Sequence, residues 1–240
     1  TRLPRKVLRE VGGKTVVQHV WEAARRSGAE EVVIATDSDE VRQACLRFGA
    51  DVRLTSPQHQ FGTDRANEIA RQAGWDPSTI VVNLQGDEPI FDPAMVEEMV
   101  DVLARETAVD MATACHPIQD TESLQSPHVV KVVVDQRGHA LYFSRAPIPS
   151  GALFYGARAL RHVGVYAFRR EALAKFAKLP RTPLEIAERL EQLRALEHGM
   201  AIAVVETRHA TVGVDVPADI KNVERFVEES LDSTHGSRIT

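Results

Sequence analysis

The stretch Ile80-Val81-Val82-Asn83-Leu84-Gln85-Gly86-Asp87-Glu88-Pro89 joins an apolar run to a short acidic cluster. The apolar half is typical of a parallel strand buried in the centre of a sheet. In open α/β sheets, ligands bind outside the carboxyl ends of such strands, which is where the acidic half stands. Gly86 would let a ligand approach the backbone, and Asp87 and Glu88 carry oxygens that suit Mg²⁺ with bound phosphates. The alternative is an ordinary turn that ends the strand.

The segments around this stretch alternate between helix and strand patterns. Apolar residues at helical spacing, with capping residues and glycine stops, predict helices over residues 15–27, 38–49, 64–73, 92–103 and 182–199 and one near 220–227. Short apolar runs predict strands over residues 32–35, 52–54, 80–84, 111–115 and 202–205. Residues 129–135 and 140–144 flank a turn and predict a hairpin. We expect an α/β fold with a mostly parallel, Rossmann-like sheet flanked by helices, plus a smaller hairpin-containing part.

Composition is that of a folded domain and excludes several classes of protein. The chain has 240 residues with 43% hydrophobic residues, and 29 Lys and Arg against 34 Asp and Glu. This balance gives no nucleic-acid footprint, and no apolar stretch is long enough to span a bilayer. Cys45 and Cys115 are too few for a disulfide framework, so we expect a cytoplasmic protein. We expect one domain over residues 1–231 and a flexible tail over 232–240.

Charged residues elsewhere could complete a phosphate site around Asp87. Asp215, in Gly213-Val214-Asp215, could pair with Asp87 on Mg²⁺, although from spacing alone a turn explains it better. Arg2 and Lys6 lie in an extended segment suited to a triphosphate, with solvated surface charge as the alternative. The chain begins at Thr1 on a polar segment, where an α/β domain usually begins with a buried strand, so we expect residues upstream.

Two glycine-containing segments open helices. Gly12-Gly13-Lys14-Thr15 is not a P-loop, because Leu8 stands where the first glycine should be. Gly62-Thr63-Asp64-Arg65 offers a turn of small residues that could admit a base or ribose, or could serve as plain capping.

Polar side chains in the second half could form a sugar pocket. Strand alternation puts His162, Gly164 and Tyr166 on one face. Glu191 and Gln192 point away from the stripe of Ile186, Leu190 and Leu193 on the predicted helix, so a solvent or subunit face is expected for them.

Taken in order, these motifs resemble the 3-deoxy-D-manno-octulosonate (Kdo) cytidylyltransferase family. The resemblance spans almost the whole chain, and the ordered set is more specific than any single motif. Its motifs are Thr1-Arg2-Leu3-Pro4 with Lys6, Ala35-Thr36-Asp37, Gly62-Thr63-Asp64-Arg65, Gln85-Gly86-Asp87-Glu88-Pro89, Tyr142-Phe143-Ser144-Arg145, Arg161-His162 with Gly164 and Tyr166, Leu190-Glu191-Gln192-Leu193-Arg194, and Gly213-Val214-Asp215.

The resemblance implies a nucleotidyltransferase fold and a set of roles. Such enzymes couple CTP to Kdo, release pyrophosphate and supply CMP-Kdo for lipopolysaccharide biosynthesis, as cytoplasmic homodimers whose smaller part serves dimerisation and sugar binding. It assigns Mg²⁺ to Asp87 and Asp215, and the triphosphate to Arg2 and Lys6. Gly62, Arg65 and Gln85 would surround the cytidine. The Kdo pocket would be lined by Arg145, His162, Tyr166, Glu191 and Gln192, which overrides the helical-face expectation if the pocket borders the dimer contact.

The sequence departs from the family pattern at Arg5, where the family has glycine, and lacks the strand and Pro-Ala-Arg segment that precede it. Three alternatives remain open. One is a cytidylyltransferase for another acidic sugar, such as sialic acid or 8-amino-Kdo. Another is a metal-dependent glycosyltransferase, although the Asp-X-Asp pair typical of that class is absent from Gln85 to Pro89. The third is a non-catalytic binding or assembly protein that retains the fold.

Overall fold

The computed structural model describes residues 5–152 and 158–207. Arg2, Asp215, the predicted helix near 220–227 and the predicted tail lie outside the described residues. The described chain divides into two compact units, one made of residues 5–58 and 84–93 and the other of residues 59–83, 94–152 and 158–207. The expected single domain over residues 1–231 stays a prediction.

The first unit contains a hairpin, two helices and a pair of parallel strands. A short 3-10 helix, η1 (Lys6–Leu8), leads into β1 (Glu10–Val11) and β2 (Lys14–Thr15). The two strands join through Gly12 and Gly13, which both have positive φ and so fit a tight turn. This hairpin is incompatible with a P-loop, as the sequence predicts. The unit continues with α1 (Val16–Ala24), β3 (Val33–Thr36), α2 (Asp39–Arg47) and β4 (Asp51–Leu54).

Side-chain caps start both helices of this unit where the sequence predicts them. Thr15 Oγ1 accepts a hydrogen bond from Gln18 N at 3.3 Å, and Ser38 Oγ accepts one from Val41 N at 3.3 Å. The strands β3 and β4 pair in parallel, from Val33 opposite Asp51 to Thr36 opposite Leu54. The β-α-β order expected from the sequence is therefore confirmed.

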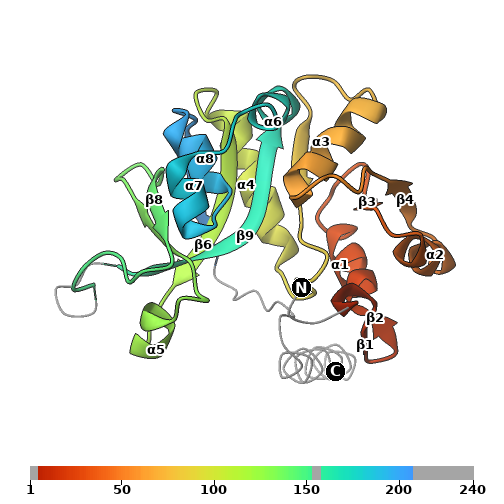
Figure 1. Ribbon diagram of the computed structural model, residues 1–240, viewed down its shortest axis with the longest axis horizontal. Helices are drawn as coiled ribbons and strands as arrows, with labels where there is room; N and C mark the ends of the chain where they lie inside the picture. Colours follow the sequence, from red (N-terminus) through yellow and green to blue (C-terminus); the bar gives the residue numbers. More distant parts are fainter. Residues whose placement is uncertain (1–4, 153–157, 208–240) are drawn as a thin grey trace, which may run out of the picture. The chain divides into compact units, whose positions relative to one another are not determined.

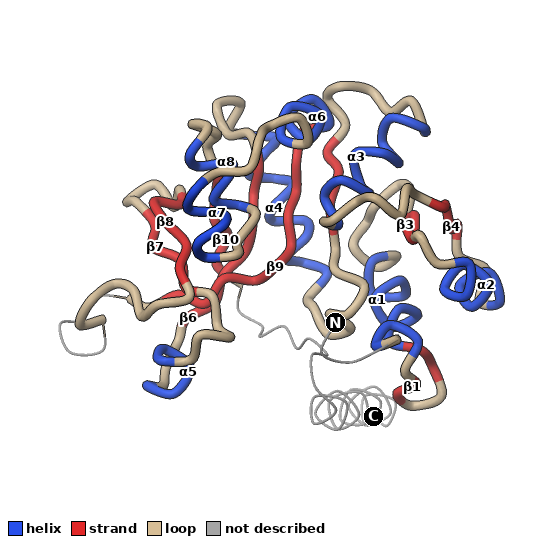
Figure 2. Tube along the Cα trace, in the orientation of Figure 1, coloured by secondary structure: helices blue, strands red, loops and turns tan. Residues whose placement is uncertain are grey.

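The second unit is built on one six-stranded sheet. Its strand order is β10-β6-β9-β7-β8, and β5 pairs with β9 as well. Figures 1 and 2 show β9 as the long strand that runs through this part of the molecule. The elements are α3 (Gly62–Gln72), β5 (Ile80–Asn83), α4 (Pro93–Arg105), β6 (Met111–Pro117), α5 (Thr121–Gln125), β7 (Lys131–Val134), β8 (Ala140–Ser144), β9 (Leu160–Arg169), α6 (Arg170–Phe176), α7 (Pro183–Glu188), α8 (Gln192–Glu197) and β10 (Ile202–Glu206).

Strand directions in this sheet are mixed. β10 runs parallel to β6, whereas β9 runs antiparallel to β5, β6 and β7. The first residues of β9 pair with β7 and the last with β5, so both strands share one edge of β9. The expected α/β sheet flanked by helices is confirmed, as is the hairpin formed by β7 and β8. The sequence predicts a parallel strand over residues 80–84, but the described pairing of β5, with β9, is antiparallel.

The core of the second unit fills the space between its sheet and helices. Tyr166 and Phe168 on β9 pack in one buried cluster with Leu173 and Phe176 of α6 and Leu193 of α8. Val165 and Ala167, which face the other way along β9, are buried as well. Both faces of this strand are therefore covered, which explains why the sequence from Val163 to Phe168 is almost continuously apolar.

The single helix predicted over residues 182–199 is wrong. The chain forms two short helices, α7 and α8, because Arg189 adopts a left-handed conformation with φ 56° between them. The predicted start is correct, as Thr182 N donates to Glu185 Oε2 at 3.3 Å. Ile186, expected to face inward, is 56% exposed. The break changes which side chains of this segment are buried.

Candidate active site

Asp87 lies in the turn that the sequence singles out, and it contacts Lys6. Glu88 N donates to Gln85 O at 3.2 Å, so the segment does form a turn. The Lys6 ammonium forms an ion pair with Asp87 Oδ2, and both side chains remain partly exposed, at 20% and 24%. The structure therefore brings together one residue predicted for the triphosphate and one predicted for the metal.

Asp87 is chemically suited to Mg²⁺, which prefers one or two carboxylates together with water and phosphate oxygens. Among residues 5–152 and 158–207, no group of three or more metal-ligating side chains gathers. A Cβ on Gly86 would lie 3.7 Å from Val7 Cγ1, an ordinary contact, so packing against Val7 does not require glycine there. A ligand close to the backbone would require it.

The segment from Gly62 to Arg65 begins α3, and its threonine does not cap the helix. Phe61 is the N-cap residue and makes no side-chain capping bond. Thr63 is 1% exposed, and its hydroxyl donates a hydrogen bond to Oε1 of Glu191, which lies 128 residues later in the chain. Arg65 Nη2 lies 3.5 Å from His59 O. Plain capping, the alternative for this segment, does not describe Thr63.

His162 and Tyr166 lie on one face of β9, as strand alternation predicts. Their ring centroids are 5.6 Å apart. Between them β9 bulges, since Thr113 of β6 is opposite Tyr166 while Ala114 is opposite Val163. Two extra residues of β9 occupy the bulge, so the alternation keeps its phase and both rings stay on the same side.

Thr113 contacts one ring nitrogen of His162. Its hydroxyl lies 2.7 Å from Val165 O and 2.9 Å from His162 Nε2. A hydroxyl has one proton, so if Thr113 donates to Val165 O, Nε2 must carry the imidazole proton and Nδ1 is left as an acceptor. Burial lowers the pKa of His162 to about 3, so the ring is neutral at physiological pH. It can accept a hydrogen bond from a hydroxyl but cannot supply a positive charge.

Tyr166 and Gln192 form a buried pair. The Tyr166 hydroxyl donates to Gln192 Oε1 at 3.0 Å, and Gln192 is 2% exposed. With its oxygen oriented in this way, Gln192 Nε2 is buried and has no hydrogen-bond partner within the described part of the chain. A buried donor without a partner costs about 1–3 kcal/mol. Such a cost is typical of a site that a ligand completes.

Glu191 presents the complementary atom. Its Oε1 accepts from Thr63, while Oε2 is buried without a hydrogen-bond partner among the residues described. Burial raises the pKa of Glu191 to about 7, opposed by the Thr63 hydrogen bond and by the charge of Arg194. Adjacent residues thus hold one unpaired acceptor and one unpaired donor, the combination that a sugar hydroxyl satisfies.

The break between α7 and α8 explains why the helical-face expectation for Glu191 and Gln192 is wrong. Glu191 is the N-cap residue of α8, and Gln192 is its first residue. The face defined by Ile186 on α7 therefore does not continue through them. Arg194 then anchors α8, because its guanidinium donates to Glu185 at 2.9 and 2.6 Å and both side chains are buried.

Arg145 lies at the end of β8 and is held by the backbone. Its Nε donates to Glu188 O and its Nη1 to Pro127 O, each at 3.0 Å. Buried Lys131 donates to Arg145 O at 2.5 Å. The register from Ser144 through Lys131 to Arg161 places Arg145 two strands from His162. The structure thus brings His162, Tyr166 and Gln192 together by direct contacts, with Glu191 next to Gln192 in the chain, and leaves the role of Arg145 a prediction.

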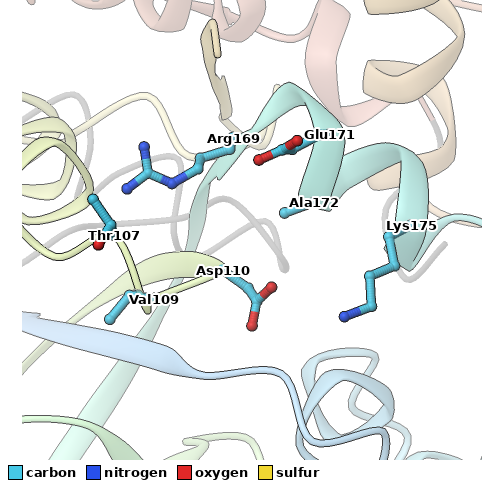
Figure 3. A pocket seen from close by; sticks show the side chains of 7 residues that line it. All are labelled: Thr107, Val109, Asp110, Arg169, Glu171, Ala172 and Lys175. Atoms are coloured by element: carbon cyan, nitrogen blue, oxygen red, sulfur yellow. The ribbon is translucent and has the colours of Figure 1, made fainter. Parts of the chain in front are cut away.

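A separate hollow of about 270 Å³ lies near the start of β6 and α6. Figure 3 shows Arg169 and Lys175 reaching along its sides, with the Asp110 carboxylate between them. Arg169 Nη2 donates to Glu106 O at 3.3 Å, and Asp110 Oδ2 accepts from Ala201 N at 2.9 Å. Two of its charged groups therefore serve the fold.

The sequence does not identify the residues that support the cluster of His162, Tyr166, Glu191 and Gln192. Thr63 and Arg194 both stand in motifs that carry the family resemblance, which assigns neither of them a role. Thr113 and Asn83 stand in strands with nothing in their spacing that marks them, and the spacing of Glu185 from Thr182 predicts only a helix cap. Only one signal could have found Thr113, namely a threonine in an otherwise apolar strand run.

A helix-flanked sheet with polar side chains at a strand end and at helix starts is typical of the nucleotidyltransferase class. The family model for cytidylyltransferase matches residues 1–202, and the chain belongs to this family. It is 48% identical to 3-deoxy-manno-octulosonate cytidylyltransferase of Geobacter sulfurreducens, with 93% of each chain covered. It is 44% identical to the protein of that name from Geobacter metallireducens, over 93% of this chain and 91% of the relative.

A solved structure of CMP:2-keto-3-deoxy-manno-octonic acid synthetase complexed with CTP has the same fold. The TM-score is 0.89 at 42% identity, covering 96% of this chain and 94% of that one. The family inferred from the ordered motifs and the α/β fold class are both confirmed. The non-catalytic alternative loses its support, because the chain belongs to an enzyme family over most of its length.

Proposed function

We propose that this chain transfers CMP from CTP to the anomeric hydroxyl of Kdo, releases pyrophosphate and serves lipopolysaccharide biosynthesis. The names of the relatives support the sugar, and the CTP complex of the similar solved structure supports the nucleotide. The single observation of this chain that carries the proposal is the buried pair of unpaired polar atoms, Glu191 Oε2 and Gln192 Nε2.

On the nucleotide side, the chain contributes positioning and charge. Phosphoryl transfer needs neutralised phosphates and in-line alignment more than covalent chemistry. Lys6 would leave Asp87 to contact the triphosphate and stabilise the departing pyrophosphate. The family resemblance assigns the same role to Arg2. Asp87 and Asp215 would hold Mg²⁺, which supplies charge neutralisation and polarisation at the α-phosphate when bound. Gly62, Arg65 and Gln85 would surround the cytidine.

On the sugar side, the pocket would read hydroxyl groups. Glu191 Oε2 would accept a hydrogen bond from a hydroxyl group, and Gln192 Nε2 would donate one to a hydroxyl oxygen. His162, which is neutral, would line the same site. A buried site built to hydrogen-bond a substrate hydroxyl rejects analogues that lack it, because its polar atoms are then left unpaired. Arg145 would approach the sugar carboxylate, since its guanidinium has five N–H donors and two are accounted for by the backbone.

We further propose Mg²⁺ dependence, a cytoplasmic location and a homodimer, all of which rest on the family resemblance. None of the described helices is long and apolar enough to cross a membrane. The nearest rivals are cytidylyltransferases for sialic acid or 8-amino-Kdo, since these sugars also carry a carboxylate and several hydroxyls. A glycosyltransferase would consume a nucleotide sugar and would not release pyrophosphate from CTP.

The test is pyrophosphate release with purified protein, CTP and Mg²⁺, with Kdo, 8-amino-Kdo or sialic acid supplied in turn. We expect release that requires CTP and Kdo and is abolished by excess EDTA, and restored by added Mg²⁺. A higher kcat/KM for 8-amino-Kdo or sialic acid than for Kdo would make that sugar the substrate in place of Kdo. No release with any sugar would overturn the proposal.

A further inference from the structure

Thr63 links two groups of residues that the proposed function assigns to different substrates. It follows Gly62 and precedes Arg65, both assigned to the cytidine side, and it bonds Glu191, assigned to the sugar side. The bond to Glu191 Oε1 spans 128 residues of sequence. The two sides of the proposed reaction are therefore linked by one buried hydroxyl.

The direction of this hydrogen bond follows from proton counting. Asn83 Nδ2 can only donate, and it lies 3.3 Å from Thr63 Oγ1. The hydroxyl accepts from Asn83 and directs its single proton to Glu191 Oε1. Asn83 and Thr63 are both buried, at 9% and 1% exposure, so water does not compete with this relay. Glu191 is thereby fixed with one oxygen engaged and Oε2 available.

A second contact joins the same two segments. The Arg194 guanidinium lies 5.5 Å from the Phe61 ring centroid and 4.8 Å from that of Phe176. Phe61 directly precedes Gly62, and Arg194 lies one helical turn after Glu191 on α8. This contact sets the approach of α8 to the start of α3. The Thr63 hydroxyl then restricts the rotation of the Glu191 carboxylate by donating a hydrogen bond to Oε1.

We propose that Thr63 is a positioning residue that orients the Glu191 carboxylate toward the sugar through the Asn83–Thr63–Glu191 relay. The inference rests on the proposed function for the identity of the sugar. The relay itself stands on the contacts within the second unit. Thr63 does not touch the reacting atoms in this account, and it acts through Glu191.

Charged groups around Glu191 make its protonation a sensitive readout of the relay. The Thr63 hydrogen bond and Arg194 lower the pKa of Glu191, while burial, Asp64 and Glu185 raise it. Thr63→Val removes the hydroxyl and preserves the shape of the side chain. It therefore raises the pKa of Glu191 further, whereas Thr63→Ser keeps the hydroxyl and leaves it near the original value. A residue that only fills space would show no such contrast.

The decisive experiment measures this pKa by carbon-13 NMR of side-chain-labelled glutamate, assigned with Glu191→Gln. Thr63→Ala serves as a second deletion of the hydroxyl if the valine variant fails to fold, and Thr107→Val is an exposed control. We expect the pKa to rise in Thr63→Val and Thr63→Ala by about one unit, the effect of a lost charge-assisted hydrogen bond. Equal values in wild type and both deletion variants would overturn the proposal, whatever substrate the enzyme uses.

Kinetics with CTP and Kdo give the second readout. Thr63→Val should raise KM for Kdo about tenfold, and Thr63→Ser should restore it to within about threefold, because the loss corresponds to one hydrogen bond to a charged group. KM for CTP should change less than twofold. A serine variant as impaired as the valine variant would contradict the relay. Wild-type protein inactive on Kdo would sink the proposed function, while the titration would still decide the role of Thr63.

Discussion

The ammonium of Lys6 and the carboxylate of Asp87 form an ion pair within the first unit. Lys6 lies in η1 near the start of the chain, and Asp87 lies in the turn after β5. Each charge compensates the other at a place that is partly exposed. A phosphate that binds Lys6 would leave Asp87 to hold a cation, so we expect the pair to keep both charges compensated until substrate binds.

Removing the charge of Asp87 should therefore impair the chemical step. We expect Asp87→Asn to lower kcat about a hundredfold, the usual effect of deleting an electrostatic stabiliser. The measurement is steady-state pyrophosphate release at saturating CTP and Kdo. Asp101→Asn, an exposed change on α4, is the matched control and should leave kcat unchanged. Near-normal turnover of Asp87→Asn would remove Asp87 from the site.

Neutralising Lys6 should weaken binding of the triphosphate. Lys6→Met keeps the length of the side chain and should raise KM for CTP about tenfold, because one charge-assisted hydrogen bond is lost. Its KM for Kdo should stay within twofold. Lys14→Met removes an exposed lysine paired with Glu22 at 2.7 Å and serves as the control. If both variants bind CTP like the wild type, Lys6 is only surface charge.

The Tyr166 hydroxyl should matter for the sugar and not for the nucleotide. Tyr166→Phe removes the hydrogen bond to Gln192 Oε1, so the Gln192 amide can rotate and Nε2 is no longer held in one orientation. We expect KM for Kdo to rise about fivefold, equivalent to one neutral hydrogen bond. The Tyr142 hydroxyl lies 3.4 Å from Glu188 Oε1, and Tyr142→Phe should raise KM for Kdo less than Tyr166→Phe does. Equal KM values in wild type and Tyr166→Phe would argue against this side of the pocket.

His162 should make the fold less stable in mild acid. Its folded pKa of about 3 lies below the unfolded value, so the unfolded chain binds more protons between these values and stability falls as pH drops through that window. From pH 7 to pH 5 this costs about 2 kcal/mol. Urea denaturation of wild type and His162→Gln at both pH values measures it. The variant should lose about 2 kcal/mol less, and an identical loss would mean that His162 is not buried neutral.

Local chemistry explains what the sequence could predict. Thr15 and Ser38 cap helices within their own first turn, and five residues connect β7 to β8, so neighbouring residues decide each of these features. The strand-end position of Asp87 and the shared face of His162 and Tyr166 also follow from short-range periodicity. The ordered motifs then supply the family.

Long-range contacts explain what the sequence could not predict. The direction of β5 depends on its pairing with β9, more than 80 positions later in the chain. No glycine or proline marks the break at Arg189 in the sequence. Because the helix ends there, Glu191 and Gln192 do not lie on the solvent face that a continuous helix predicts. The bond between Thr63 and Glu191 exists only in the folded chain. The supporting contacts of Thr113 and Asn83 also join residues that are distant in the sequence.

The most direct test of the central claim is phosphorus NMR of the complete reaction with CTP, Kdo, Mg²⁺ and the full-length protein. We expect CTP to be replaced by equal amounts of pyrophosphate and one new phosphodiester resonance, that of CMP joined to the sugar, and only when Kdo is present. CTP that stays intact, or that yields CDP and inorganic phosphate, would contradict it.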